Sequence, residues 1–285
     1  LSNLNTLYVS YNQISDLSPL SNLLNLQQLI LWSNNISTLA PISNLTNLVY
    51  IDIDSNNISD LSPLSGLSNL NTLYVSYNQI SDLSPIIGLT NLRVLDIGYN
   101  PITDITQLAQ MTWLESLGIN GVNASDISFI TPLQNLIELS VYNNEIEDIS
   151  TLLQMSNLQY LDIGANPISN IELIGNMTQL RYLGGSELGI SEISFVSSLV
   201  NLYQLTLNNN NISDISPISN LTGLQYLYLG SNSITDIQNM SKSIYAYDDS
   251  NPYEQNIIVG PHYHPGVFEE ETLPEDFKAN EIYSI

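Results

Sequence analysis

The sequence predicts an α/β solenoid, a stack of short turns that each add one strand to a curved parallel sheet. A leucine recurs every twenty-two residues without a slip, at Leu4, Leu26, Leu48, Leu70, Leu92, Leu114, Leu136, Leu158, Leu180, Leu202 and Leu224. Each leucine opens a segment of the pattern LxxLxLxxNxI, as from Leu4 to Ile14. A fixed period with this pattern is typical of leucine-rich repeats. We therefore expect an arc of eleven turns over residues 1–240, with short 3₁₀, helical or irregular segments on its convex side.

The spacing of apolar residues predicts which side chains face inward. We number each turn from its leucine, which is position 1. Positions 1, 4, 6, 11, 14, 17 and 20 are apolar in most turns, and we expect them to form one continuous core. Positions 3, 5 and 7 alternate with core residues along the strand, so their side chains should point out of the concave face. Val122 and Leu188 stand where Asn is usual, and we expect the strand exit to be rewound in those two turns.

Polar side chains recur at two further positions. Position 9 is asparagine in Asn12, Asn34, Asn56, Asn78, Asn100, Asn144, Asn166, Asn210 and Asn232. An inward amide there could bond backbone groups at the strand exit and bridge neighbouring turns. Position 13 is acidic in Asp16, Asp60, Asp82, Asp104, Asp126, Asp148, Glu192, Asp214 and Asp236. We expect these acids to cap the convex segments. A calcium ladder is the alternative, but it would need more oxygen ligands per turn.

Composition narrows the class of partner. The chain has 28 acidic residues against 4 basic ones, a formal net charge of -24. Phosphate contacts need a Lys/Arg surface, so this balance disfavours nucleic acid, and an anionic membrane would repel the chain. There is no cysteine, which removes disulfides and thiol chemistry. No apolar run approaches the ~20 residues of a membrane span, so we expect no insertion into a membrane. We also expect the chain to be a monomer.

The two ends of the chain carry separate expectations. Residues 1–3 stand in the same phase as residues 67–69, and we expect the chain to begin inside a longer protein. The period is lost from Ser241, and we expect residues 241–285 to form a C-terminal cap followed by an acidic tail or linker, with a last strand over residues 243–247. His262 and His264 lie near glutamates, but two histidines two residues apart are weak support for a metal site, and we expect none.

Aromatic residues gather on the predicted strand stretch and form most of the candidate ligand site. The candidates are Tyr8, Tyr11, Trp32, Tyr50, Tyr74, Tyr77, Tyr99, Tyr142, Tyr160, Tyr182, Tyr226 and Tyr228. Aromatic residues favour strands, so stacking between strands is one explanation. Rigid amphipathic rings are also what recognition surfaces collect. We predict that these rings form a binding surface on the concave face.

Acidic residues share this surface. Asp52 and Asp54 lie on one strand, about 6.5–7 Å apart from the rise per residue, and Asp96 follows two turns later. Such a pair could serve a glycosidase or bind calcium. However, an open sheet should give too little desolvation to raise one pKa for acid catalysis, and the repeats contain no His or Cys. We therefore include these three acids in the ligand site and expect no enzyme, no cofactor and no metal.

The repeats resemble those of the bacterial internalin family. The likeness rests on ISDLSPLSNLLNLQQL over residues 14–29 and NISDISPISNLTGLQYLYL over residues 211–229, and it covers residues 1 to about 240. It implies an exported or wall-bound bacterial surface protein whose concave face grips a host cell-surface protein, with no enzymatic activity in the repeats. Eukaryotic phosphatase-regulator repeats of the same length are a weaker likeness.

The predicted function follows from the fold, the rings and this resemblance. We expect an extracellular or cell-surface bacterial domain that binds a macromolecule, a protein first of all, through its concave Tyr/Trp-rich face. A glycan-binding surface protein is one alternative, because Tyr and Trp platforms beside Asp and Asn also suit sugars. An intracellular adaptor of the phosphatase-regulator type is the other.

Overall fold

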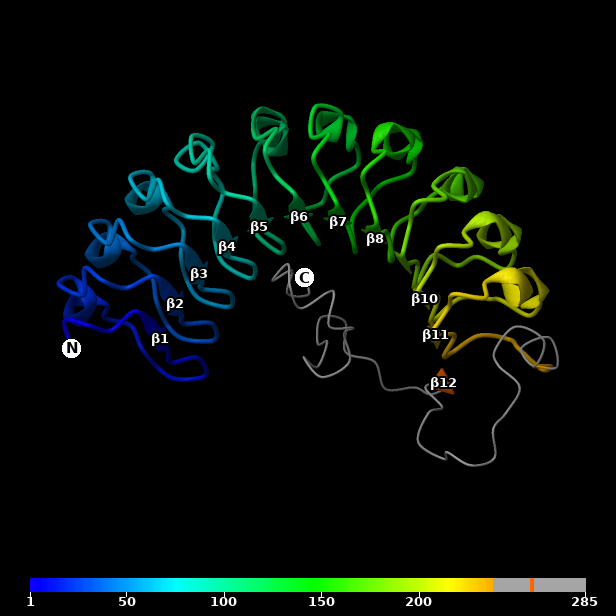
Figure 1. Ribbon diagram of the computed structural model, residues 1–285, viewed down its shortest axis with the longest axis horizontal. Coiled ribbons are helices and arrows are strands. Elements are labelled where there is room, and N and C mark those ends of the chain that lie inside the picture. The colour runs from blue at the N-terminus through cyan, green and yellow to red at the C-terminus, as the bar shows by residue number, and fades with distance from the viewer. Residues whose placement is uncertain (238–256, 259–285) are drawn as a thin grey trace.

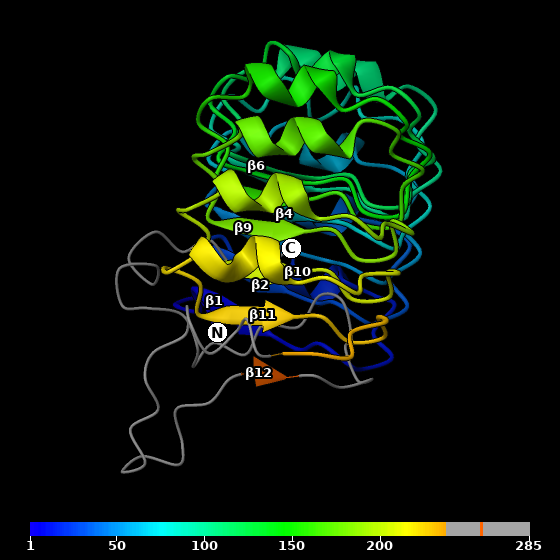
Figure 2. The same ribbon diagram turned by 90° about the vertical axis from the view of Figure 1, so that its right-hand side faces the viewer.

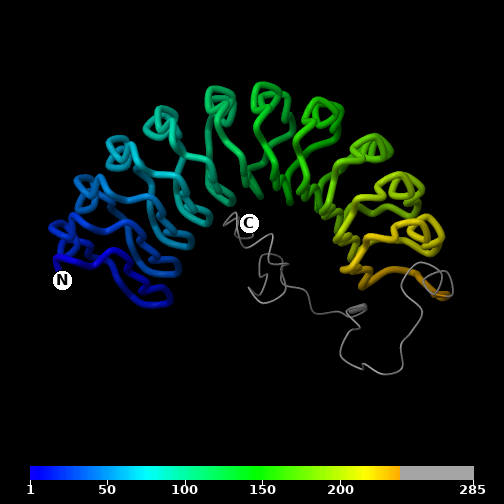
Figure 3. Tube along the Cα trace, viewed as in Figure 1, coloured from blue at the N-terminus to red at the C-terminus, as the bar shows by residue number. Residues whose placement is uncertain are grey.

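The chain folds into an open arc of stacked turns (Figure 1), seen here in a computed structural model that describes residues 1–237 and 257–258. Its strands are β1 (Thr6–Tyr8), β2 (Gln28–Ile30), β3 (Tyr50–Asp52), β4 (Thr72–Tyr74), β5 (Val94–Asp96), β6 (Ser116–Gly118), β7 (Glu138–Ser140), β8 (Tyr160–Asp162), β9 (Tyr182–Gly184), β10 (Gln204–Thr206), β11 (Tyr226–Tyr228) and β12 (Ile257–Ile258). They form one sheet in sequence order, all parallel, which lines the inner side of the arc (Figure 1). The Cα trace follows the arc turn by turn (Figure 3). The predicted solenoid is confirmed.

The sheet register repeats the sequence period. Leu7 pairs with Leu29 at one end of the arc and Leu205 with Leu227 at the other, each a shift of one turn. At the far end β12 pairs in parallel with β11, so a segment beyond the repeats extends the sheet. The strand expected over residues 243–247 lies outside the described residues, as do His262 and His264. The predicted domain boundary at residue 240 stays a prediction.

The core occupies the predicted positions. In the second turn all seven inward positions, Leu26, Leu29, Leu31, Ile36, Leu39, Ile42 and Leu45, are 0 % exposed. The same columns continue through the arc as one apolar cluster. Burying each Leu or Ile stabilises the fold by ~1.5–3 kcal/mol, and each turn covers the face of its neighbour. The core thus fixes which side chains remain for the concave surface.

Buried asparagines join successive turns at the strand exit. The Asn56 Oδ1 accepts the Ile36 backbone N–H at 2.9 Å, and its Nδ2 donates to the carbonyls of Leu31, Ile53 and Asp54 at 3.1 Å. Asn56 therefore binds groups of its own turn and of the preceding one, as predicted for this column.

The two irregular turns use the next asparagine twice. In turn six the Asn144 Oδ1 accepts the N–H groups of both Val122 and Ala124, and in turn nine Asn210 does the same for Leu188 and Ile190. The backbone there takes a second left-handed residue, Asn123 or Gly189. The expected rewinding of the strand exit is confirmed in both turns.

Short 3₁₀ helices form the convex side, stacked one above another (Figure 2). They are η1 (Ser18–Leu20), η2 (Ala40–Ile42), η3 (Ser62–Leu64), η4 (Ile105–Gln110), η5 (Ser128–Ile130), η6 (Ser150–Gln154), η7 (Ile171–Asn176), η8 (Ser194–Ser198) and η9 (Ser216–Asn220). Acidic residues at position 13 cap several of these segments: Asp214, for example, accepts the N–H and the hydroxyl of Ser216 at 2.8 and 2.9 Å. These bonds, the backbone N–H first, hold the pKa of Asp214 below its usual value. The predicted capping role is confirmed there.

A left-handed residue follows each of the strands β1 to β11 at position 8. Non-glycine residues with φ between 50° and 57° there are Tyr11, Ser33, Ser55, Tyr77, Tyr99, Asn143, Ala165, Asn209 and Ser231, and Glu187 has φ 60°. The left-handed region is uncommon for residues other than Gly, Asn and Asp. The three tyrosines in this column therefore have a backbone conformation that is energetically unfavourable for tyrosine.

Candidate functional site

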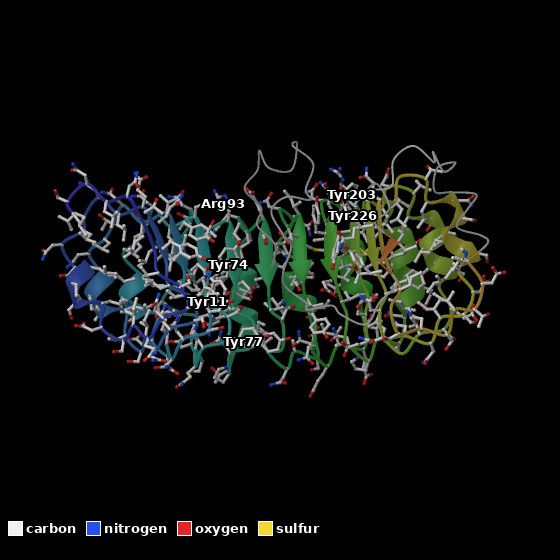
Figure 4. The ribbon with its side chains drawn as sticks, turned by 90° about the horizontal axis from the view of Figure 1, so that it is seen from below. Tyr11, Tyr74, Tyr77, Arg93, Tyr203 and Tyr226 are labelled. Atoms are coloured by element: carbon white, nitrogen blue, oxygen red, sulfur yellow. The ribbon has the colours of Figure 1, made fainter. Side chains whose placement is uncertain are left out.

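The concave face has two edges with different side chains (Figure 4). Positions 7 and 8 form the strand-exit edge, where Tyr11 and Tyr77 are seen. Positions 2 and 3 form the strand-entry edge, where Arg93, Tyr203 and Tyr226 lie on the opposite side of the arc. Tyr74, at position 5, lies between the two edges. The predicted site residues therefore do not form one patch.

Two aromatic pairs lie on the strand-exit edge. The rings of Tyr11 and Trp32 meet edge to face, with centroids 4.0 Å apart. The rings of Tyr77 and Tyr99 stack with centroids 4.2 Å apart and planes 12° from parallel. Tyr11 and Tyr77 are nevertheless 71 % and 54 % exposed. Each pair thus offers a rigid ring surface to solvent, and turn three, with Ser55 at position 8, separates the two pairs.

Glycines on the following turn make room for two of the tyrosine rings. A Cβ on Gly121 would clash with the ring of Tyr99, and Gly121 also has φ +59°. A Cβ on Gly164 would lie 2.8 Å from the ring of Tyr142. The hydroxyl of Tyr142 donates to the Glu187 carboxylate at 2.9 Å, which holds that ring in place. These rings are therefore positioned by the backbone of the next turn and by their partners.

Ser76 joins two of the candidate acids. Its backbone N–H donates to the Asp54 Oδ1 at 2.5 Å, and its hydroxyl donates to the Asp96 Oδ1 at 2.6 Å. Asp96 also accepts the Gly98 N–H at 2.9 Å, and Asp52 accepts the Asp54 N–H at 3.3 Å. The structure therefore connects Asp52, Asp54 and Asp96, which sequence reasoning had placed along one strand and two turns away.

Burial raises the pKa of the concave carboxylates. Desolvation brings the pKa of Asp52 to about 6 and that of Asp162 to about 6, and it brings the pKa of Glu138 to about 7. The pKa of Asp54 is also raised, first by burial and then by the charges of Asp96 and Asp52. The expectation that an open sheet gives too little desolvation to raise such a pKa was wrong. Neighbouring rings and strands remove water from these groups, since each lies between two adjacent turns.

The remaining aromatic residues mostly pack against each other between turns. Centroid distances are 5.8 Å for Tyr50 and Tyr74, 6.5 Å for Tyr160 and Tyr182, and 5.1 Å for Tyr203 and Tyr226. Stacking between strands therefore accounts for part of the aromatic pattern. Tyr74 is only 7 % exposed, whereas Tyr8, at the same position of an identical segment, is 62 % exposed. Tyr228 is half-buried at position 5 of the last repeat strand.

Sequence reasoning missed three features of this face. Ser76 was not a candidate, although a small hydroxyl residue at position 7 between two acidic turns was a usable signal. Gly121 was not considered as part of the site, although the tyrosine at position 8 one turn earlier could have indicated its role. Glu138 was not included in the site, yet it accepts the Ser116 hydroxyl at 3.1 Å on the same face.

The described part of the concave face offers several kinds of side chain for contact with a ligand. Within residues 1–237 and 257–258, no three His, Cys, Asp or Glu side chains are grouped so that they could hold a metal ion. Across the same residues, no helix has the length and apolar character to cross a bilayer. What the face presents is exposed rings, hydrogen-bonded carboxylates and small polar groups, spread over adjacent strands.

Comparison with known proteins fits this class of repeat protein. The family described as "Leucine Rich repeats (2 copies)" matches residues 2–44, 24–66, 46–88, 68–110, 90–133, 134–176 and 200–242. An internalin (inlF) from Listeria monocytogenes is 34 % identical with a TM-score of 0.65, covering 85 % of this chain and 78 % of that one. Internalin C2 from the same organism is 31 % identical with a TM-score of 0.60, covering 66 % and 83 %. The chain belongs to the leucine-rich-repeat family and is a bacterial internalin-like member of it.

A more distant match shares the fold alone. The ectodomain of the plant receptor kinase GASSHO1/SCHENGEN3 from Arabidopsis thaliana, solved in complex with CASPARIAN STRIP INTEGRITY FACTOR 2, is 18 % identical with a TM-score of 0.54, covering 84 % of this chain and 37 % of that one. Comparison with curated protein sequences found no match. An internalin-like repeat fold of this kind is typically a binding scaffold without enzymatic activity.

Proposed function

We propose that this chain is the non-enzymatic binding domain of an exported or cell-surface bacterial protein, and that its concave face recognises a protein partner, such as a host cell-surface receptor. The observation that carries the proposal is the strand-exit edge. Tyr11 and Tyr77 are exposed, held in a left-handed conformation and packed against a second ring. Every repeat turn is left-handed at position 8, so the conformation belongs to the fold, but the fold does not require a tyrosine there, and an exposed ring at a position that suits Gly or Asn better points to a role in binding.

The chemistry of the face supports a macromolecular ligand. Tyrosine and tryptophan dominate the energetics of protein interfaces because their rings bury a large area and lose little entropy. The two aromatic pairs lie on turns one to five, and neighbouring strands are about 4.8 Å apart, so together they cover about 20 Å. That length fits a protein edge or an extended segment. The plant receptor ectodomain in its complex is an example of the same fold holding a partner.

A selection experiment tests the proposal. A displayed library of host ectodomains would be screened against the full chain and against a Tyr11→Ala/Tyr77→Ala variant. We expect at least one protein that binds the parent chain and binds the variant more than about tenfold more weakly, the scale of a lost hot spot. Thermal unfolding of both proteins serves as the control, because both rings are largely exposed. Binding that survives the double substitution would place the recognition surface elsewhere.

A glycan-binding role is the second candidate, favoured by the half-buried Trp32 ring beside the exposed Tyr11. A glycan array read with the parent chain and with Trp32→Ala separates the two roles. Sugar binding that disappears in this variant, with no protein selected from the library, would replace the protein ligand with a glycan.

A further inference from the structure

The strand-exit edge combines rings and one acidic group in a fixed order. We call Tyr11, Trp32, Asp54, Tyr77 and Tyr99 the rim stripe. The first aromatic pair belongs to turns one and two, Asp54 to turn three, and the second pair to turns four and five. The small residue Ser55 occupies position 8 beside Asp54. The gap between the pairs is therefore one turn wide, with rings on both sides and a carboxylate within it.

Among the described residues, no basic side chain pairs with the acids around this gap. Within residues 1–237 and 257–258, Asp52, Asp54 and Asp96 form no ion pair with a Lys or Arg side chain, and Arg93 pairs with Glu115 at 3.5 Å on the opposite edge. The whole chain has 4 basic residues against 28 acidic ones. The carboxylates of Asp54 and Asp96 both accept a hydrogen bond from Ser76. Their negative charges are therefore close enough to repel each other. A positive group from outside would relieve that repulsion.

We propose that the rim stripe binds an extended basic segment of the partner protein and receives one arginine side chain beside Asp54, between the two aromatic pairs. This inference rests on the proposed function. A guanidinium is planar, stacks on tyrosine and tryptophan rings, and forms paired hydrogen bonds with a carboxylate, whereas an ammonium does only part of this. The aliphatic or aromatic neighbours of the arginine would then cover the exposed rings of Tyr11 and Tyr77.

The pKa pattern agrees with such a ligand. Burial and the neighbouring charges of Asp96 and Asp52 raise the pKa of Asp54 in the free protein. A guanidinium beside Asp54 would favour its ionised form, so binding should release protons and weaken as the pH falls. The described groups that interact with Asp54 are Asp52 on the same turn, Ser76 and Tyr77 on the next turn and Asp96 two turns away, and none of them is cationic.

A peptide panel tests the arginine subsite. Four fluorescein-labelled nonapeptides of threonine and leucine would differ only at the central residue, which is arginine, lysine, glutamine or glutamate. Their affinity for the full chain would be measured by fluorescence anisotropy. We expect the arginine peptide to bind at least about tenfold more tightly than the glutamine peptide, because hydrogen bonds between charged groups are stronger than those of a neutral amide. The lysine peptide should fall between them.

Matched variants assign the preference to Asp54. Asp54→Asn should reduce the arginine preference to less than about twofold. Asp60→Asn removes the same charge from the convex side of the same turn, where an asparagine can still cap Ser62, and it should leave the preference intact. Gly121→Ala should displace the Tyr99 ring and weaken all four peptides together. Circular dichroism confirms that each variant is folded.

The outcomes separate this inference from the proposed function. Equal binding of the arginine and glutamine peptides, or no binding of any peptide up to about 1 mM, overturns the arginine subsite. An equal loss of preference in Asp60→Asn also overturns it, because the attraction is then a general effect of net charge. A protein partner that depends on Tyr11 and Tyr77 but not on Asp54 would leave the proposed function standing and remove this inference alone.

Discussion

Replacing Asn166 by alanine would test the asparagine chain that joins the turns. Asn166 is 4 % exposed in turn eight, away from the rim stripe. Its Oδ1 accepts the Ile146 N–H at 3.1 Å, and its Nδ2 donates to the carbonyls of Val141, Ile163 and Gly164 at 2.9, 3.0 and 3.0 Å. Alanine removes all of these bonds at once and leaves buried backbone groups without partners.

The size of the effect follows from these contacts. A buried N–H that loses its partner costs ~1–3 kcal/mol, and each of the two amide hydrogens contributes ~1 kcal/mol. We therefore expect the free energy of unfolding to fall by about 3–5 kcal/mol. This is a large part of the ~5–15 kcal/mol that stabilises an ordinary domain. Asn166→Asp should be at least as damaging at neutral pH, because its carboxylate would face three carbonyl oxygens.

Urea unfolding followed by far-UV circular dichroism measures this loss, and hydrogen exchange locates it. The Ile146 amide should exchange faster in the variant, while amides of turns one to three should change less, because each turn contacts only its neighbours. Peptide or partner binding at the rim stripe should be retained. A loss below about 1 kcal/mol with the Ile146 amide still protected would show that the asparagine chain is not needed to hold the turns together.

Three further predictions concern the concave face. Tyr77→Asn relieves the left-handed strain but loses the stacked ring, two opposite effects of ~1 kcal/mol each. The free energy of unfolding should therefore change by less than about 1 kcal/mol, while partner binding falls more than about tenfold. A large loss of stability would show that the ring has a structural role. Gly121→Ala should lower the melting temperature and weaken the same binding, and an unchanged Tyr99 environment in aromatic NMR spectra would contradict this. Burial raises the pKa values of Asp162 and Glu138 to about 6 and 7, so the folded state holds their protons more tightly than the unfolded chain. The stability that these two protonated groups contribute is complete below about pH 4 and is lost as the pH rises through 6 to 7. The melting temperature should therefore fall between about pH 4 and 7, less steeply in Asp162→Asn/Glu138→Gln, and a melting temperature that rises over this range would refute the assignment.

The repeat period by itself was sufficient to predict the fold and the inner side chains. A side chain that recurs every twenty-two residues packs against its own copy on the next turn, so one turn defines the surroundings of the others. The position-4 column illustrates this, because Leu29, Ile51 and Leu73 are each 0 % exposed. The asparagine and position-13 columns were predictable for the same reason, since their partners are backbone groups that every turn supplies.

The concave site was less predictable, because it depends on side chains of different turns. Residues 1–19 and 67–85 are identical, yet Tyr8 is 62 % exposed and Tyr74 is 7 % exposed. Tyr74 packs against the ring of Tyr50 one turn earlier, and no pattern within the repeat carries that information. The link from Asp54 through Ser76 to Asp96 likewise spans three turns and depends on rotamers that the spacing does not specify.

The asparagine chain also restricts how proteins of this kind can change in length. An insertion or deletion that is not a whole number of turns would displace the asparagine amide from its backbone partners at the junction where the change falls, whereas gain or loss of complete turns leaves each junction as it was. Recombination can thus lengthen or shorten the arc only in steps of one strand. Gain or loss of a turn between the two aromatic pairs would move them apart or together by one strand spacing. Variants of this protein should therefore bind ligands whose lengths differ in steps of one strand spacing.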